Sequence, residues 1–232
     1  MRVIPAAEVS LIHQQFTEGK MSVAETVKKY SEGIEALRDE SGPSAPGLVQ
    51  LYTNLGQVHK TQEEWHKAED AFKQALYLEE ELKGKDDPSL ATYHNALGGM
   101  YRNQGNNEEA ETEYLQALHC HQRQTDKGND PKVDTDSAVY LNNLALVYKT
   151  QERLALAEKI YVHLIKQGMK LLGETHAQMA LRYSNLGSLA ARRGRKEEAH
   201  RLFTRAHEIC IQNYGRDHPE TTSVMQWLQA IT

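Results

Sequence analysis

Basic side chains recur at long, regular intervals along this 232-residue chain. Lys60, Arg102 and Lys149 are spaced by 42 and 47 residues, and Arg192 follows 43 residues after Lys149. Lysine and arginine attract carboxylates and phosphates, so a row of such residues predicts recognition of an acidic ligand. Whether the row exists in space depends on the structural elements that carry these residues.

Asparagines form a second periodic set beside the basic one. Its members are Asn54, Asn95, Asn142, Asn143 and Asn185. A carboxamide both donates and accepts hydrogen bonds, so a ladder of asparagines can bind the backbone of an extended peptide whatever the peptide's sequence. The alternative is that these amides only tie neighbouring helices together.

A repeated pattern indicates which elements carry the two sets. Four segments align on the leucines Leu55, Leu97, Leu144 and Leu186, each followed by a small residue. Thirteen residues after each leucine comes an alanine, and four residues later an aromatic: Ala68 and Phe72, Ala110 and Tyr114, Ala157 and Tyr161, Ala199 and Phe203. Apolar residues recur at helical spacing within each copy, which predicts two antiparallel helices whose small residues let the axes approach closely.

These columns resemble the tetratricopeptide repeat over roughly residues 47–228. The 42-residue period and the stretches Leu172–His176 and Tyr214–Pro219 are similar to the kinesin light chain subtype of that family. The resemblance implies an all-α fold, a right-handed α-α superhelix of antiparallel helix pairs whose first helices line a concave groove. It also implies a non-enzymatic adaptor or scaffold that binds another protein or a peptide.

The same register predicts how the chain is divided. Residues 1–40 are expected to form a degenerate N-terminal helix pair, followed by a linker at 41–47 that is rich in Gly, Pro and Ser and therefore flexible. Four repeats follow over 48–219, at about 48–88, 89–131, 132–176 and 177–219. Residues 220–232 are expected to form a helix that caps the last repeat, because a terminal repeat has no further neighbour.

The central parts of the predicted first helices contain no acidic residues. Across their 52 central positions (49–61, 91–103, 138–150 and 180–192) there is no Asp or Glu, where the average composition would give about 7. Five basic residues occupy the same segments: Lys60, Arg102, Lys149, Arg182 and Arg192. Burial alone would deplete both signs of charge, so we expect a neutral-to-positive groove that holds an acidic or phosphorylated segment. The contacts predicted for this groove are Asn54, Lys60, Asn95, Arg102, Asn142, Asn143, Lys149, Asn185 and Arg192.

Charge is also uneven along the chain. Residues 47–131 contain 8 basic and 15 acidic residues, whereas residues 132–232 contain 14 basic and 10 acidic ones. Four positive charges crowd the turn from Arg192 to Lys196. This turn is either a solvated loop or a second contact for an acidic partner.

Other functional classes have little support in the sequence. No phosphate-binding loop, nucleophile elbow or metalloprotease motif is present, so we expect no catalytic residue and no cofactor. His119 and His121 lie two residues apart, hence on nearly opposite faces of a helix, and predict no metal site. A net charge of -5 argues against nucleic-acid and membrane partners. Two cysteines and the lack of a signal-like N-terminus favour a cytoplasmic protein.

Two alternatives to an adaptor stay open at this point. A regulatory sensor would close its groove on a peptide or a small signal molecule. A self-assembling structural scaffold would bind copies of itself. The sequence does not identify the partner or the oligomeric state.

Overall fold

The computed structural model describes residues 6–125 and 131–231, with side chains described for 8–122 and 136–231. The ends of the predicted N-terminal pair and cap helix, and the loop expected before the third repeat, lie partly outside these ranges. The chain divides into two compact units, Met1–Asn129 and Asp130–Thr232.

The helices of the first unit are α1 (Ala6–Thr17), α2 (Val23–Ser41), α3 (Gly47–Thr61), α4 (Trp65–Lys83), α5 (Leu90–Asn103) and α6 (Asn107–Thr125). The second contains α7 (Pro131–Thr150), α8 (Leu154–Leu171), α9 (Ala177–Arg192), α10 (Lys196–Tyr214) and α11 (Pro219–Ile231).

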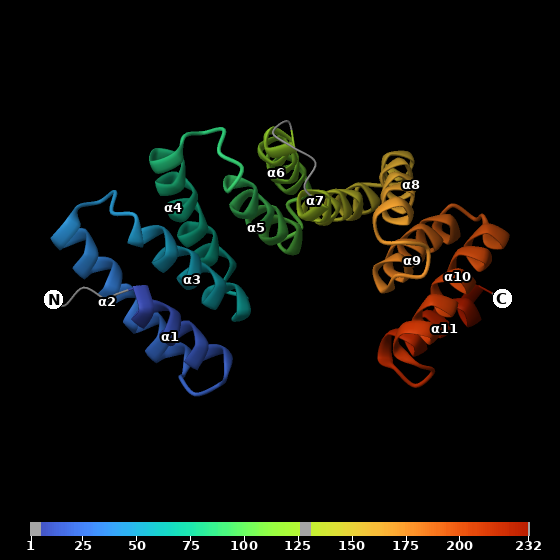
Figure 1. The fold of residues 1–232 in the computed structure, drawn as a ribbon, viewed down its shortest axis with the longest axis horizontal. Helices are drawn as coiled ribbons and strands as arrows, with labels where there is room; N and C mark the ends of the chain where they lie inside the picture. Colours follow the sequence, from blue (N-terminus) through green and yellow to red (C-terminus); the bar gives the residue numbers. More distant parts are fainter. Residues whose placement is uncertain (1–5, 126–130, 232) are drawn as a thin grey trace. The chain divides into compact units, whose positions relative to one another are not determined.

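The described part of the chain is all-α, as the sequence predicts, and successive helices pack as hairpins within each unit (Figure 1). None of these helices combines the length and the apolar character that a bilayer crossing needs.

Close helix contact rests on the predicted columns of small residues. The column alanines Ala68, Ala110, Ala157 and Ala199 are fully buried, which confirms their place at helix crossings. A Cβ on Gly98 would lie 2.9 Å from the Tyr114 ring, so the aromatic of the second helix lies directly on the bare backbone of the first. Gly56 lies in the same way against Phe72, and Gly187 against Phe203, so three of the repeats pack a ring directly on a glycine.

The turn within each repeat places one residue in the left-handed region. The equivalent residues are Glu63, Gly105, Glu152 and Gly194, with φ of 57°, 82°, 59° and 75°. In the sequence, glycine marks this turn in only two of the four copies. A residue with a Cβ costs roughly 1 kcal/mol in this conformation, so the two glutamates must be held by their surroundings.

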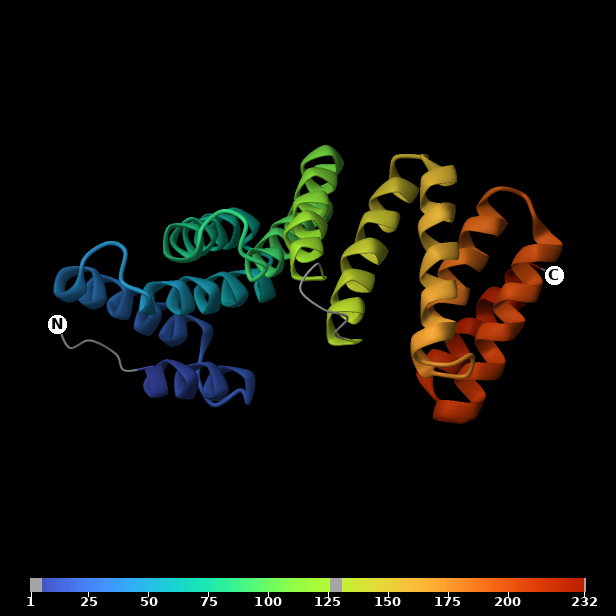
Figure 2. The same ribbon diagram turned by 45° about the horizontal axis from the view of Figure 1, so that its top comes forward.

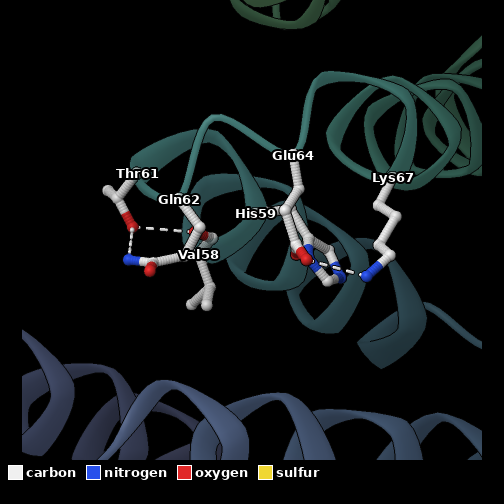
Figure 3. Close-up of polar contacts among 6 residues, drawn as sticks. All are labelled: Val58, His59, Thr61, Gln62, Glu64 and Lys67. Atoms are coloured by element: carbon white, nitrogen blue, oxygen red, sulfur yellow. Dashed lines mark hydrogen bonds and ion pairs between the residues drawn. The ribbon is translucent and has the colours of Figure 1, made fainter.

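Polar contacts hold the turn between α3 and α4 (Figure 3). The buried His59 ring is 2.5 Å from Glu64, Nδ1 to Oε2, and Lys67 Nζ donates to Glu64 Oε1 at 2.8 Å. The hydroxyl of Thr61 donates to the Val58 carbonyl at 2.7 Å. Hydrogen bonds from Lys67 and then His59 lower the pKa of Glu64, so its carboxylate form is favoured next to Glu63.

The N-terminal helix pair packs against the first repeat. Val9, Ile12, Tyr30 and Ile34 of α1 and α2 share one core with residues of α3 such as Leu48. In the segment between α2 and α3, Ala45 is only 5% exposed and belongs to the same core. The linker is thus anchored by an apolar contact despite its flexible composition.

The last helix, α11, packs on α10, and both ribbon views show α9, α10 and α11 side by side (Figures 1 and 2). Val224 and Thr221 are buried, and the Thr221 hydroxyl donates to the Gly215 carbonyl at 2.7 Å. The Trp227 ring stacks on Phe203 with ring centroids 6.2 Å apart. α11 therefore covers apolar side chains of the preceding hairpin.

We predict that Ala110→Leu destabilises the fold by about 1–3 kcal/mol, because a larger side chain cannot fit at a fully buried crossing without moving the helices. Urea unfolding followed by circular dichroism measures this. Gln116→Leu, at an exposed position of the same helix, is the control and should change the stability little. An unchanged unfolding midpoint for Ala110→Leu would rule out this packing.

Removal of residues Thr221–Thr232 should expose Phe203 and the apolar surface around it. The truncated protein is expected to aggregate or to melt at a lower temperature, because α11 is the neighbour that covers this surface. Thermal unfolding and light scattering test the effect. A truncated chain as stable and as soluble as the full one would contradict a capping role for α11.

Candidate partner-binding cleft

The second unit contains a cleft of about 460 Å³ between its first helices and α10. Fifteen residues line it: Lys149 of α7; Ala177, Gln178, Ala180, Leu181, Ser184, Asn185 and Ser188 of α9; Phe203, Cys210 and Tyr214 of α10; and Glu220, Ser223, Val224 and Trp227 of α11. Lys149 and Asn185 are predicted site residues, and the structure brings them together here.

Lys149 is the basic residue of this cleft. It is half-buried, and its Nζ donates to the Ser188 hydroxyl at 3.2 Å. Burial lowers the pKa of Lys149, and the positive charge of Arg192 lowers it further. An ammonium group in this position is incompletely compensated, so an anion that enters the cleft would stabilise its charge.

Two of the predicted asparagines bond to each other. Asn185 Nδ2 donates to Asn142 Oδ1 at 2.8 Å, which links α9 to α7. The alternative role considered for the asparagine set, tying neighbouring helices together, is therefore present at this pair. Asn185 also lines the cleft, so the bond fixes an amide at its wall. Asn143, on α7, is half-buried.

The arginines of the turn after α9 are paired with carboxylates of the preceding hairpin. Arg192 pairs with Glu152, and Arg193 pairs with Glu158. Arg195 contacts Glu158 at 2.7 Å. These ion pairs connect consecutive repeats, and a partner that uses this turn would have to compete with them.

The other predicted residues lie in the first unit. Lys60 and Arg102 are half-buried on α3 and α5, and Asn95 is half-buried on α5. Asn54 is only 6% exposed, and its Oδ1 accepts a hydrogen bond from Gln50 at 2.8 Å. Each unit thus carries part of the predicted set.

The cleft also has exposed apolar side chains in its wall, which the sequence prediction did not include. Leu181, Tyr214 and Trp227 line it and are 59%, 44% and 53% exposed. Trp227 lies one 42-residue repeat after Asn185 and so holds the equivalent position on its helix. This spacing is the sequence signal that relates Trp227 to the groove residues of the first helices. The cleft can therefore contact both a charged and an apolar side chain of one ligand.

This architecture, helix pairs with exposed first-helix side chains and a cleft between repeats, is that of a helical-repeat interaction module. The tetratricopeptide repeat family model matches residues 47–123 and 136–212. The chain belongs to the tetratricopeptide repeat family, which confirms the identification made from the repeated columns. Proteins built from this repeat generally act as interaction modules without catalytic activity.

Solved structures with the same fold are numerous, although no curated protein matches the sequence. BtubC (BKLC) from P. vanneervenii is 25% identical with a TM-score of 0.72, covering 91% of this chain and 83% of its own. The kinesin light chain TPR-like repeats of Podosopora anserina are 14% identical with a TM-score of 0.75, covering 90% and 95%. YrrB, described as a TPR protein with an unusual peptide-binding site, is 16% identical with a TM-score of 0.57, covering 94% and 90%.

We predict that Lys149 titrates below the pKa of an ordinary lysine, and that Arg192→Gln raises its pKa by removing a neighbouring positive charge. Side-chain NMR of ¹³C-labelled lysine across a pH series gives both values. Arg201→Gln, which removes an exposed charge on α10, serves as the control. A Lys149 pKa that is unaffected by Arg192→Gln would contradict the proposed proximity of the two charges.

Proposed function

We propose that this protein is an adaptor whose first-helix surface binds an extended, acidic or phosphorylated segment of another protein, with the cleft of the second unit as the main contact. The proposal rests mainly on the burial and the neighbours of Lys149. This cation is half-buried inside a cleft, bonded to a neutral hydroxyl and close to another cation.

The energetics favour an anionic ligand at that point. A partly buried ammonium group has lost hydration that the Ser188 hydroxyl replaces only in part. A carboxylate or phosphate next to Lys149 would restore a full charge partner, while Asn185 offers amide groups to the ligand backbone. Lys60 and Arg102, on first helices of the first unit, would give that unit a similar preference for acidic groups.

The finer assignments belong to the same proposal. A kinesin light chain-like subtype fits the 42-residue period, and a cytoplasmic location fits the cysteine usage. A sensor and a self-assembling scaffold are the rival functions. A sensor would change its radius of gyration on ligand binding, and self-assembly would give a mass that rises with concentration.

The test uses two pools of fluorescent dodecapeptides, one rich in Glu and phosphoserine and one with Gln and Ser at the same positions. We expect the parent protein to prefer the acidic pool, with affinity falling as salt increases. Lys149→Glu should weaken acidic-pool binding several-fold, and Lys60→Glu, Arg102→Glu and Lys149→Glu together should weaken it further. Fluorescence anisotropy at two salt concentrations measures these affinities.

The matched control is Lys166→Glu, which makes the same charge change at an exposed position of α8. It should retain the preference of the parent. Equal affinity of the parent for both pools would refute the proposed function. So would equal losses for Lys149→Glu and Lys166→Glu, because the preference would then reflect net charge alone.

A further inference from the structure

One equivalent position of the repeats holds an apolar or aromatic residue in three copies and a charged residue in the fourth. Four residues before each repeat leucine stand Leu51, Tyr93, Tyr140 and Arg182. Leu51 and Tyr140 are buried, as the repeat requires of this position. Arg182 is also buried, at 9% exposed, so the chain places a charge where its other copies place an apolar or aromatic side chain. Departures of this kind from the local rule mark functional or strained positions.

The neighbouring helix makes room for this arginine. A Cβ on Gly168 of α8 would clash with the Arg182 guanidinium and would lie 2.5 Å from the Met179 sulfur. At the equivalent second-helix position the other copies have Glu79, His121 and Cys210. The glycine therefore accompanies the arginine, and its missing side chain leaves the space that the Arg182 guanidinium occupies.

Arg182 has no carboxylate partner among the described residues. Its Nη1 donates to the main-chain carbonyl of Leu164, and burial lowers its pKa. By contrast, the half-buried Arg205 contacts both Glu174 at 3.4 Å and Glu208 at 3.2 Å. A guanidinium has five donors, and burying it without a counter-charge is costly.

Arg182 lines a hollow of about 290 Å³ between α7, α8 and α9. Val139 and Leu181 form exposed apolar parts of its wall, and Asn142 and Gln178 bring carboxamides. Leu181 and Gln178 also line the cleft that contains Lys149. The hollow and the cleft are therefore adjacent parts of one surface of the second unit.

We propose that Arg182 is the recognition site for a carboxylate side chain of the bound segment. This proposal rests on the proposed function and assigns one specific contact to it. A carboxylate carries a single negative charge and accepts two parallel hydrogen bonds from a guanidinium. It would neutralise Arg182, whereas a doubly charged phosphate would leave an excess negative charge beside the apolar wall.

A purely structural role makes a different prediction. If Arg182 served only to bond the Leu164 carbonyl, replacing it would lower stability. If it is an unpaired buried charge kept for binding, Arg182→Met should leave the melting temperature unchanged or raise it, because an apolar side chain suits this position better. Arg182→Tyr, which restores the residue of the two preceding copies, provides a second variant with the same expectation.

The direct experiment records the guanidinium NMR signals of arginine, with Arg182 assigned by its loss in Arg182→Met. The probes are N-acetyl-glutamate α-methylamide and the matching derivatives of glutamine and phosphoserine, in which the α-carboxylate is blocked and the probes differ only in their side chains. We expect the Arg182 signal to shift with the glutamate probe, less with the phosphoserine probe and not with the glutamine probe. An Arg182 signal that does not shift with the glutamate probe, or that shifts more with the phosphoserine probe, would overturn the proposal.

The peptide pools separate this inference from the proposed function. Arg182→Met should weaken acidic-pool binding by about 30-fold or more, as expected when one partner of a buried charge pair is removed. The control Arg205→Met should bind like the parent. If the parent prefers the acidic pool and Arg182→Met keeps that affinity, the proposed function stands and the Arg182 assignment fails. If the parent has no preference, the proposed function itself fails, and the NMR result alone decides the role of Arg182.

Discussion

The structure depends on one packing constraint, the contact between a small residue of a first helix and an aromatic ring of the second. At Gly98 the space available beneath Tyr114 does not admit a methyl group. Because the helices lie so close together, the alanine column is fully buried. This close packing restricts how the two helices of a hairpin can be placed against each other. Both helices of a hairpin contribute buried side chains to the core, and the first helices also carry partly exposed polar residues.

Among those polar residues, the basic ones determine the charge of the proposed binding surface. The first helices carry Lys149 and Arg182 on one unit, both partly or fully withdrawn from water. Surface arginines nearby, such as Arg193, are paired with glutamates and link consecutive repeats. The contrast separates two uses of positive charge. Paired charges at the turns connect the repeats, and incompletely compensated charges lie on the surface that we propose binds a partner.

The fold could be predicted from sequence because its determinants are local and repeated. The alanine and aromatic columns recur in four copies at fixed spacing, and a helical period is readable within each copy. The turns were expected in every repeat, but the left-handed conformation of Glu63 and Glu152 was not predicted, since the sequence indicates that conformation only where glycine occupies it. Tertiary contacts, including the Glu64 interactions beside Glu63, are absent from any sequence pattern.

The candidate site was predicted less completely. Periodicity placed Lys149, Asn142 and Asn185 on first helices, and the structure brings these residues near one another. Periodicity could not show that Asn54 would be buried, because burial depends on how the N-terminal pair packs. The charge pattern indicated Arg182 only as one of five basic residues on the first helices. Comparing each repeat column with its own copies would have singled it out, but the room supplied by Gly168 required the structure.

The proposed binding surface for ligands is the first-helix surface of the second unit. NMR mapping of backbone amides with the acidic peptide pool tests this most directly. We expect shifts concentrated at Lys149, Asn185 and Ser188 and extending to residues around Trp227. Shifts confined to the exposed faces of α8 and α10, with these residues unaffected, would contradict it.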